Sequence, residues 1–258
     1  MEIWNIYKME IIKILKRKNS LILLIPSILI VIMAFGISTG GLTFTGGISS
    51  DGTFACLDFV TAMWGFFSTL GIWGILLILV TAFQFSGEIT SGQIKMTLLR
   101  IGKRGPIIIA KFFALTTAAI GAFVLFTLTA VGSYYLFVAN SSIGNASFSS
   151  ATIDFPNLVA MIGFILLHLA LFMAIALLAG LFLSPFIAFI LSLVSLFAVN
   201  YLINSNAFEF AKYSALSVSN HLISGEAENL IPALLSSILI IACILISTSL
   251  LFKRVDIK

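Results

Sequence analysis

Six long runs of apolar residues, separated by shorter polar stretches, dominate the pattern along the chain. A helix that crosses a bilayer needs about 20 predominantly apolar residues, and each run is long enough. The pattern predicts six membrane-spanning helices, over residues 21–39, 58–85, 106–139, 157–183, 186–204 and 232–252. The third run exceeds one crossing, so this helix is expected to tilt or to protrude.

Two of the polar stretches carry helical patterns of their own. In residues 1–18 the apolar side chains share one helical face and most of the basic ones lie elsewhere, which predicts an interfacial amphipathic helix. Simple basic anchoring of the first span is the alternative. In residues 86–105, Ile94, Leu98 and Ile101 recur at helical spacing, which favours a short amphipathic helix over an ordinary loop.

Composition supports the membrane assignment. Hydrophobic residues make up 60% of the 258 residues and charged residues only 9%, against roughly 25% in soluble domains. So few charges cannot cover a soluble fold of this size. The expected fold class is therefore an all-α integral membrane protein, with residues 1–258 forming a single transmembrane domain.

Charge position predicts the orientation. The N-terminal segment, residues 86–111 and the tail hold five, five and three of the 14 basic residues, and Lys212 is the other. Alternating loops place these three segments on one side, and positive charge stays in the cytoplasm. Both termini are therefore expected to be cytoplasmic, in a protein of the cell membrane. The net charge of +4 follows this topology and does not predict a nucleic-acid partner.

Motifs for catalysis are missing from the sequence. Gly87 and Gly92 have the spacing of a phosphate-binding loop, but Gln93 and Ile94 stand where Lys and Ser or Thr are required. The sequence has neither H-E-x-x-H nor G-x-S-x-G. We therefore expect no enzyme activity, no cofactor and no metal site in this chain.

Few polar residues inside the spans stand out. His168 lies within an apolar run, where ionisable residues are functional candidates, yet its own run holds no carboxylate to exchange a proton with. A neutral, hydrogen-bonded structural histidine is the competing interpretation. The sequence assigns no role to His221, and Cys56 and Cys243 are interpreted as packing residues.

The segment after the second span resembles a motif of type-2 ABC exporter permeases, the membrane subunits of drug, lantibiotic-immunity and bacitracin-resistance exporters. That motif has a Glu, a Gly-Thr pair, two Leu, a Pro and Arg, and a Lys entering the next span. The matching residues are Glu88, Gly92, Leu98, Leu99, Arg104 and Lys111. Gln93 replaces the Thr, and Pro106 follows the Arg instead of preceding it.

The resemblance implies a cytoplasmic coupling helix that docks on a separate ABC ATPase, present in two copies, which would bind ATP and Mg. The expected docking residues are Glu88, Gly92, Lys95, Arg100, Lys103 and Arg104, the charged ones as surface charges. Residues 205–231, too apolar for a plain loop and too broken for a span, would form short re-entrant helices on the extracellular side.

The resemblance also implies a dimer, with an identical or a sister permease, around a pathway lined by the second and fifth spans. Ser192, Ser195 and Asn200 are candidate pathway residues; bonds to neighbouring helices are the equal alternative. The expected function is ATP-driven export of an amphipathic cargo: a peptide antibiotic or toxin, a drug, or a lipid-linked molecule. The alternatives are an ATP-independent secondary transporter and a non-transporting membrane scaffold or sensor.

Overall fold

A computed structural model describes residues 3–42, 54–102, 104–149, 154–205, 208–223 and 228–254, without the side chain of Arg100. All the regular elements in these ranges are helices. Six are long and apolar enough to cross a membrane: Lys18–Ser38, Ile72–Thr90, Gly105–Val138, Phe155–Ala179, Pro185–Asn204 and Leu230–Arg254. The prediction of an all-α chain with six such helices is confirmed.

The first half of the chain begins with α1 (Ile3–Lys16), followed by the 3-10 helix η1 (Lys18–Leu24) and α2 (Ile25–Ser38). The next helices are α3 (Cys56–Thr69), α4 (Ile72–Thr90) and α5 (Gln93–Ile101). α6 (Gly105–Ser133) continues into the π-helix η2 (Tyr134–Val138).

The second half contains α7 (Phe155–Ala179) and α8 (Pro185–Asn204), then the 3-10 helix η3 (Glu209–Tyr213), α9 (Ala215–Ile223) and α10 (Leu230–Arg254). The five prolines explain several helix starts, since each lies within the first three residues of a helix: Pro26, Pro106, Pro156, Pro185 and Pro232. There, the missing N–H leaves no hydrogen bond of the helix unmade.

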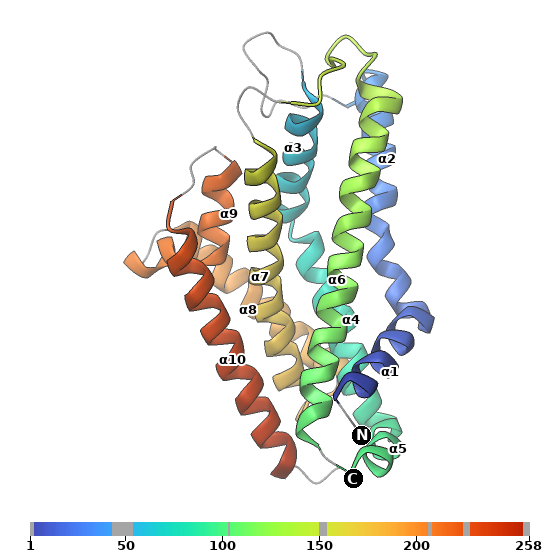
Figure 1. Ribbon diagram of the computed structural model, residues 1–258, viewed down its shortest axis with the longest axis vertical. Coiled ribbons are helices and arrows are strands. Elements are labelled where there is room, and N and C mark those ends of the chain that lie inside the picture. The colour runs from blue at the N-terminus through green and yellow to red at the C-terminus, as the bar shows by residue number, and fades with distance from the viewer. Residues whose placement is uncertain are drawn as a thin grey trace.

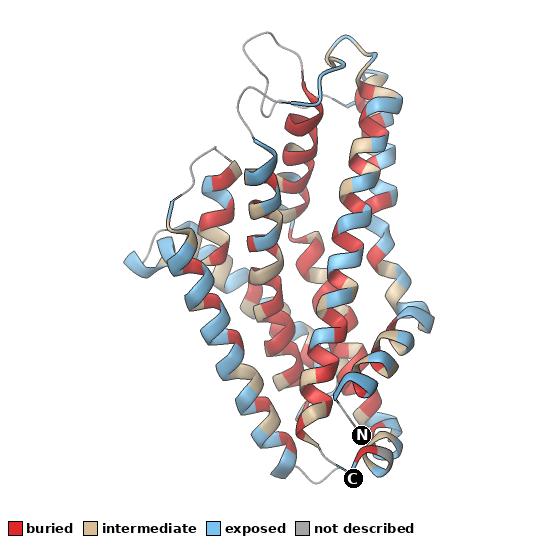
Figure 2. Ribbon diagram, in the orientation of Figure 1, coloured by how far each residue is buried: buried red, intermediate tan, exposed pale blue. Residues whose placement is uncertain are grey.

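The helices form one elongated bundle, in which α6 packs against α1, α2 and α10, and α7 against α4, α8, α9 and α10 (Figure 1). The start of α1, the whole of α5 and the end of α10 lie at the same end of this bundle (Figure 1). Burial is concentrated in α3, α4, α6 and α7, whereas α8 and α10 expose most of their apolar side chains (Figure 2).

The structure divides the predicted span 58–85 into α3 and α4. Gly71, between them, has φ +68°, a conformation that favours glycine. Gly71 and Gly74 also allow α8 to approach, because a Cβ atom would lie 3.2 Å from the Phe197 ring at Gly71 and 2.4 Å from Leu196 Cδ2 at Gly74. The sequence shows these glycines but not the turn that one of them makes.

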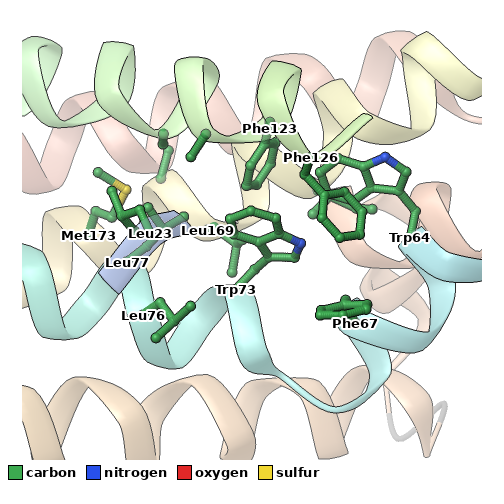
Figure 3. Close-up of a cluster of buried hydrophobic side chains, with 14 of the residues drawn as sticks. Leu23, Trp64, Phe67, Trp73, Leu76, Leu77, Phe123, Phe126, Leu169 and Met173 are labelled. Atoms are coloured by element: carbon green, nitrogen blue, oxygen red, sulfur yellow. The ribbon is translucent and has the colours of Figure 1, made fainter. Parts of the chain in front are cut away.

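Aromatic rings pack around this break (Figure 3). Trp64 of α3 and Trp73 of α4 stack with ring centroids 5.7 Å apart, and Phe126 of α6 lies 4.9 Å from the Trp64 ring centroid. Phe123 lies 4.6 Å from Trp73, and Phe67 lies 5.0 Å from Phe126. These five side chains, which we call the aromatic cluster, fasten both halves of the broken helix to α6.

Candidate functional site

Helix α5 is set off from its neighbours by two glycine turns. Gly92 precedes it and Gly102 follows it, both with φ +72°, so the chain turns sharply on either side. Ile94 and Ile101 are buried and attach α5 to the bundle, whereas Met96 and Leu99 are 61% and 82% exposed. A helix with an apolar exposed edge at the end of the molecule is a candidate docking surface.

Next to α5 lies a group of paired charges from separate segments: Glu10 and Lys13 of α1, Arg17 after it, Glu88 of α4 and Lys111 of α6. We call it the charge cluster. The Lys111 ammonium donates to Glu88 Oε2 at 2.8 Å and to Glu10 Oε2. Lys13 Nζ donates to Glu10 Oε1 at 2.7 Å, and Arg17 Nη2 donates to Glu88 Oε1 at 2.7 Å. Glu10 therefore meets two cations, and Glu88 meets three, since Lys13 Nζ also lies 3.8 Å from Glu88 Oε1.

Three of the five charged side chains in the charge cluster are buried. Glu10, Glu88 and Lys111 have side chains no more than 2% exposed, whereas Lys13 and Arg17 are about a third exposed. A buried charge is tolerated only when it is paired and hydrogen-bonded. The three cations outnumber the two carboxylates, so the surplus charge lies on the side chains that reach the surface.

The pKa of Glu10 reflects this balance. Burial acts to raise the pKa of its carboxyl, but the ammonium groups of Lys111 and Lys13, through charge and hydrogen bonds, outweigh burial and lower it below the ordinary value of 4.5. The carboxylate is therefore the stable form of Glu10 in the folded chain.

Arg17 connects the charge cluster to α5. Besides Glu88, its guanidinium donates to Gln84 Oε1 and to Gln93 Oε1, each at 3.0 Å. Gln93 is the first residue of α5. Gln84 in turn donates to Ser20 Oγ of η1, at 3.1 Å. The planar guanidinium thus links α1, α4 and the start of α5 through several directed bonds.

The predicted docking residues separate in the structure. Glu88 was expected at the surface as a docking charge, and this is wrong: the side chain is buried because it pairs with Lys111 and Arg17. Gly92 forms a turn, and Lys95 is exposed on α5. Arg104 donates to the carbonyls of Phe252 and Lys253, at 3.3 and 3.4 Å. Lys103 and the side chain of Arg100 lie outside the described residues.

The candidate pathway residues bond within the bundle. The Ser192 hydroxyl donates to the Ala188 carbonyl and the Ser195 hydroxyl to the Ser192 carbonyl, both within α8. Asn200 Oδ1 lies 2.9 Å from His168 Nε2 of α7. Because a carbonyl oxygen accepts, His168 Nε2 carries the hydrogen. The interpretation of His168 as a hydrogen-bonded structural residue agrees with this contact.

Sequence reasoning missed the charge cluster as a unit. Lys111 was matched to the motif, but the partnership with Glu10 and Glu88 was not predicted. A signal for it exists, because a lysine seven residues into an apolar helix needs a carboxylate close by. Glu10, an acid within an otherwise basic amphipathic segment, is the other half of that signal.

The charged side chains of the charge cluster make ion pairs and hydrogen bonds with one another. Among the described residues, no three His, Cys, Asp or Glu side chains gather as a metal site requires. The carboxylates of the charge cluster face ammonium and guanidinium groups, which fixes their positions.

No family model matches the chain, and a search of the curated proteins finds no match. The resemblance to type-2 exporter permeases therefore remains a prediction from the sequence.

Proposed function

We propose that the chain is the permease subunit of an ATP-driven ABC exporter, in which α5 docks on a separate ATPase subunit. The observation that carries the proposal is the form of α5: a short helix between two glycine turns, with an exposed apolar edge and with its first residue, Gln93, bonded to Arg17 of the charge cluster. Six helices long and apolar enough to span a membrane supply the rest of such a subunit.

The charge cluster supplies a path from the docking helix to the spans. Arg17 contacts Gln93 of α5 and Glu88 of α4, and Lys111 of α6 contacts Glu88 and Glu10. A displacement of α5 by the ATPase would therefore be carried to α1, α4 and α6 together. In this proposal ATP and Mg bind to the two ATPase subunits, and the cargo is an amphipathic peptide, drug or lipid-linked molecule.

Other elements take their places in the same proposal. α1 is the interfacial helix, with Trp4 exposed and stacked on Tyr7 and the Lys8 ammonium 5.3 Å from the Trp4 ring centroid. η3 and α9 are the re-entrant helices on the extracellular side. The exposed apolar faces of α8 and α10 meet lipid or a second permease, identical or sister.

The test is copurification of the tagged chain from the cells that produce it, with mass spectrometry to identify a bound ABC ATPase. Leu99→Asp and Lys95→Glu change the exposed side of α5, and we expect each to reduce the recovered ATPase about tenfold, equivalent to about 1.4 kcal/mol. Lys212→Glu is the matched control, an equal charge change on exposed η3. Full recovery with both α5 variants would refute docking at α5.

A second candidate, ATP-independent secondary transport, is favoured by one observation. The helix is interrupted at Gly71, and interrupted helices near the membrane midplane form the substrate sites of many secondary transporters. Transport by the purified chain in liposomes without any ATPase would support this candidate over the exporter.

A further inference from the structure

A small cavity lies at the break between α3 and α4, lined by Ser68, Trp73, His168 and Asn200 among others. Its volume, measured as the space open to the centre of a water molecule, is about 20 Å³. About 10–15 Å³ in this measure is enough for one water molecule. The cavity is therefore large enough for a single water and too small for a larger ligand.

Two of its lining residues carry polar atoms without a partner. Trp73 is only 1% exposed, and neither its indole Nε1–H nor the buried Ser68 hydroxyl has a hydrogen-bond partner among the described residues. The hydroxyl of neighbouring Thr69 bonds back to the Gly65 carbonyl at 2.8 Å, as helical hydroxyls commonly do. Ser68 makes no such bond, so its hydroxyl is left for a partner in the cavity.

The helix break adds donors to the same place. Gly71, Trp73 and Gly74, at the beginning of α4, line the cavity. The first N–H groups of a helix have no acceptor within the helix. In a bundle surrounded by apolar side chains these groups need an oxygen atom to accept from them. His168 and Asn200 already bond to each other, at 2.9 Å.

We propose that one buried water molecule occupies this cavity and accepts hydrogen bonds from the Trp73 indole and from the Ser68 hydroxyl. Its own hydrogens reach the polar edge formed by His168 and Asn200. The water satisfies the two buried side-chain donors that lie beside the turn at Gly71. The proposal holds for a transporter of either kind, because it concerns the bundle and not its partner.

The direct test is water-edited solid-state NMR on the full chain in lipid bilayers, with the indole nitrogens labelled. The chain has three tryptophans, and the other two are matched controls. Trp4 is 57% exposed, whereas Trp64 is fully buried with its Nε1 donating to Thr127 Oγ1 at 3.2 Å. Trp→Phe variants assign the three signals.

At short mixing times we expect the Trp73 indole to receive magnetisation from water nearly as fast as Trp4, and the Trp64 indole to receive almost none. Ser68→Ala should slow the transfer to Trp73 alone. Transfer to Trp73 as slow as to Trp64 would mean a dry cavity and overturn the proposal.

Thermal unfolding provides an independent readout. With a water present, Ser68→Ala and Trp73→Phe each lower the unfolding temperature, and the double variant loses less than the sum because both act on one water. In a dry cavity, Trp73→Phe removes an unsatisfied donor and raises the unfolding temperature relative to Trp64→Phe, which removes a satisfied one.

Discussion

The two ends of α4 are fastened by opposite kinds of contact. Near its start, Trp73 packs into the aromatic cluster; near its end, Glu88 joins the charge cluster. Rings pack without strict direction, so a smaller side chain loses contacts in proportion to its size. Paired buried charges depend on one another, so the loss of one leaves the others uncompensated. Substitutions near the start of α4 should therefore cost stability in proportion to the volume removed. Loss of one charge near its end should cost most of the stability that the charge cluster contributes.

The largest expected effect comes from Lys111→Met. It removes the cation between two buried carboxylates, and we expect the free energy of unfolding to fall by about 4 kcal/mol, within the range for breaking a buried ion pair. Thermal or denaturant unfolding in detergent measures it. Adding Glu10→Gln should restore part of the loss, because one of the two buried carboxylates that lost the Lys111 ammonium is then neutral. A single variant as stable as the wild type would contradict this view of the charge cluster.

In the aromatic cluster, the free energy of unfolding should fall by more when a smaller side chain is substituted. Phe126 is fully buried against Trp64, Phe67 and Trp73. We expect Phe126→Ala to cost about 3 kcal/mol and Phe126→Leu about 1 kcal/mol, because the leucine fills most of the space. The same unfolding measurement applies. Equal losses for the two variants would show that the loss of stability in this region does not depend on the volume removed.

The contributions of the charge cluster and the aromatic cluster to stability should also differ in their dependence on pH. The folded pKa of Glu10 is lowered, so its ionised form contributes stability that is complete above its ordinary pKa of 4.5. As the pH falls below 4.5 towards the folded pKa, that contribution is lost. We therefore expect the unfolding temperature to fall more in wild type than in Glu10→Gln between pH 5 and more acidic conditions. The loss caused by Phe126→Leu should not change with pH.

The sequence predicts the spans well because an apolar run long enough for a bilayer has few other uses. Prolines at helix starts and the glycines around α5 strengthen those boundaries. The break at Gly71 was not predicted, because a glycine in an apolar run is also compatible with close packing of a straight helix. Only the approach of Phe197 and Leu196 from α8 shows what the two glycines do.

The sequence singles out residues 86–105, but it does not show which charged side chains of this segment are buried. The structure has a short helix over Gln93–Ile101, and Ile94 and Ile101 are its buried residues. The charged residues among the predicted docking residues were all expected to be exposed, because charged side chains in a polar stretch usually are. The pairing of Glu88 with Lys111 and Arg17 depends on contacts between segments up to 71 residues apart, which one sequence does not reveal.

The combined length of α6 and η2 has a practical consequence. The helix from Gly105 to Val138 has 34 residues and is therefore about 50 Å long, against about 30 Å of hydrocarbon. No ordinary tilt absorbs that difference, so part of it stands clear of the bilayer. At the C-terminal end of this helix the Tyr134 hydroxyl lies within hydrogen-bond distance of the Phe54 and Asn145 carbonyls. A nanobody that binds the part outside the bilayer would provide an alignment marker for electron microscopy of a 27.9-kDa chain.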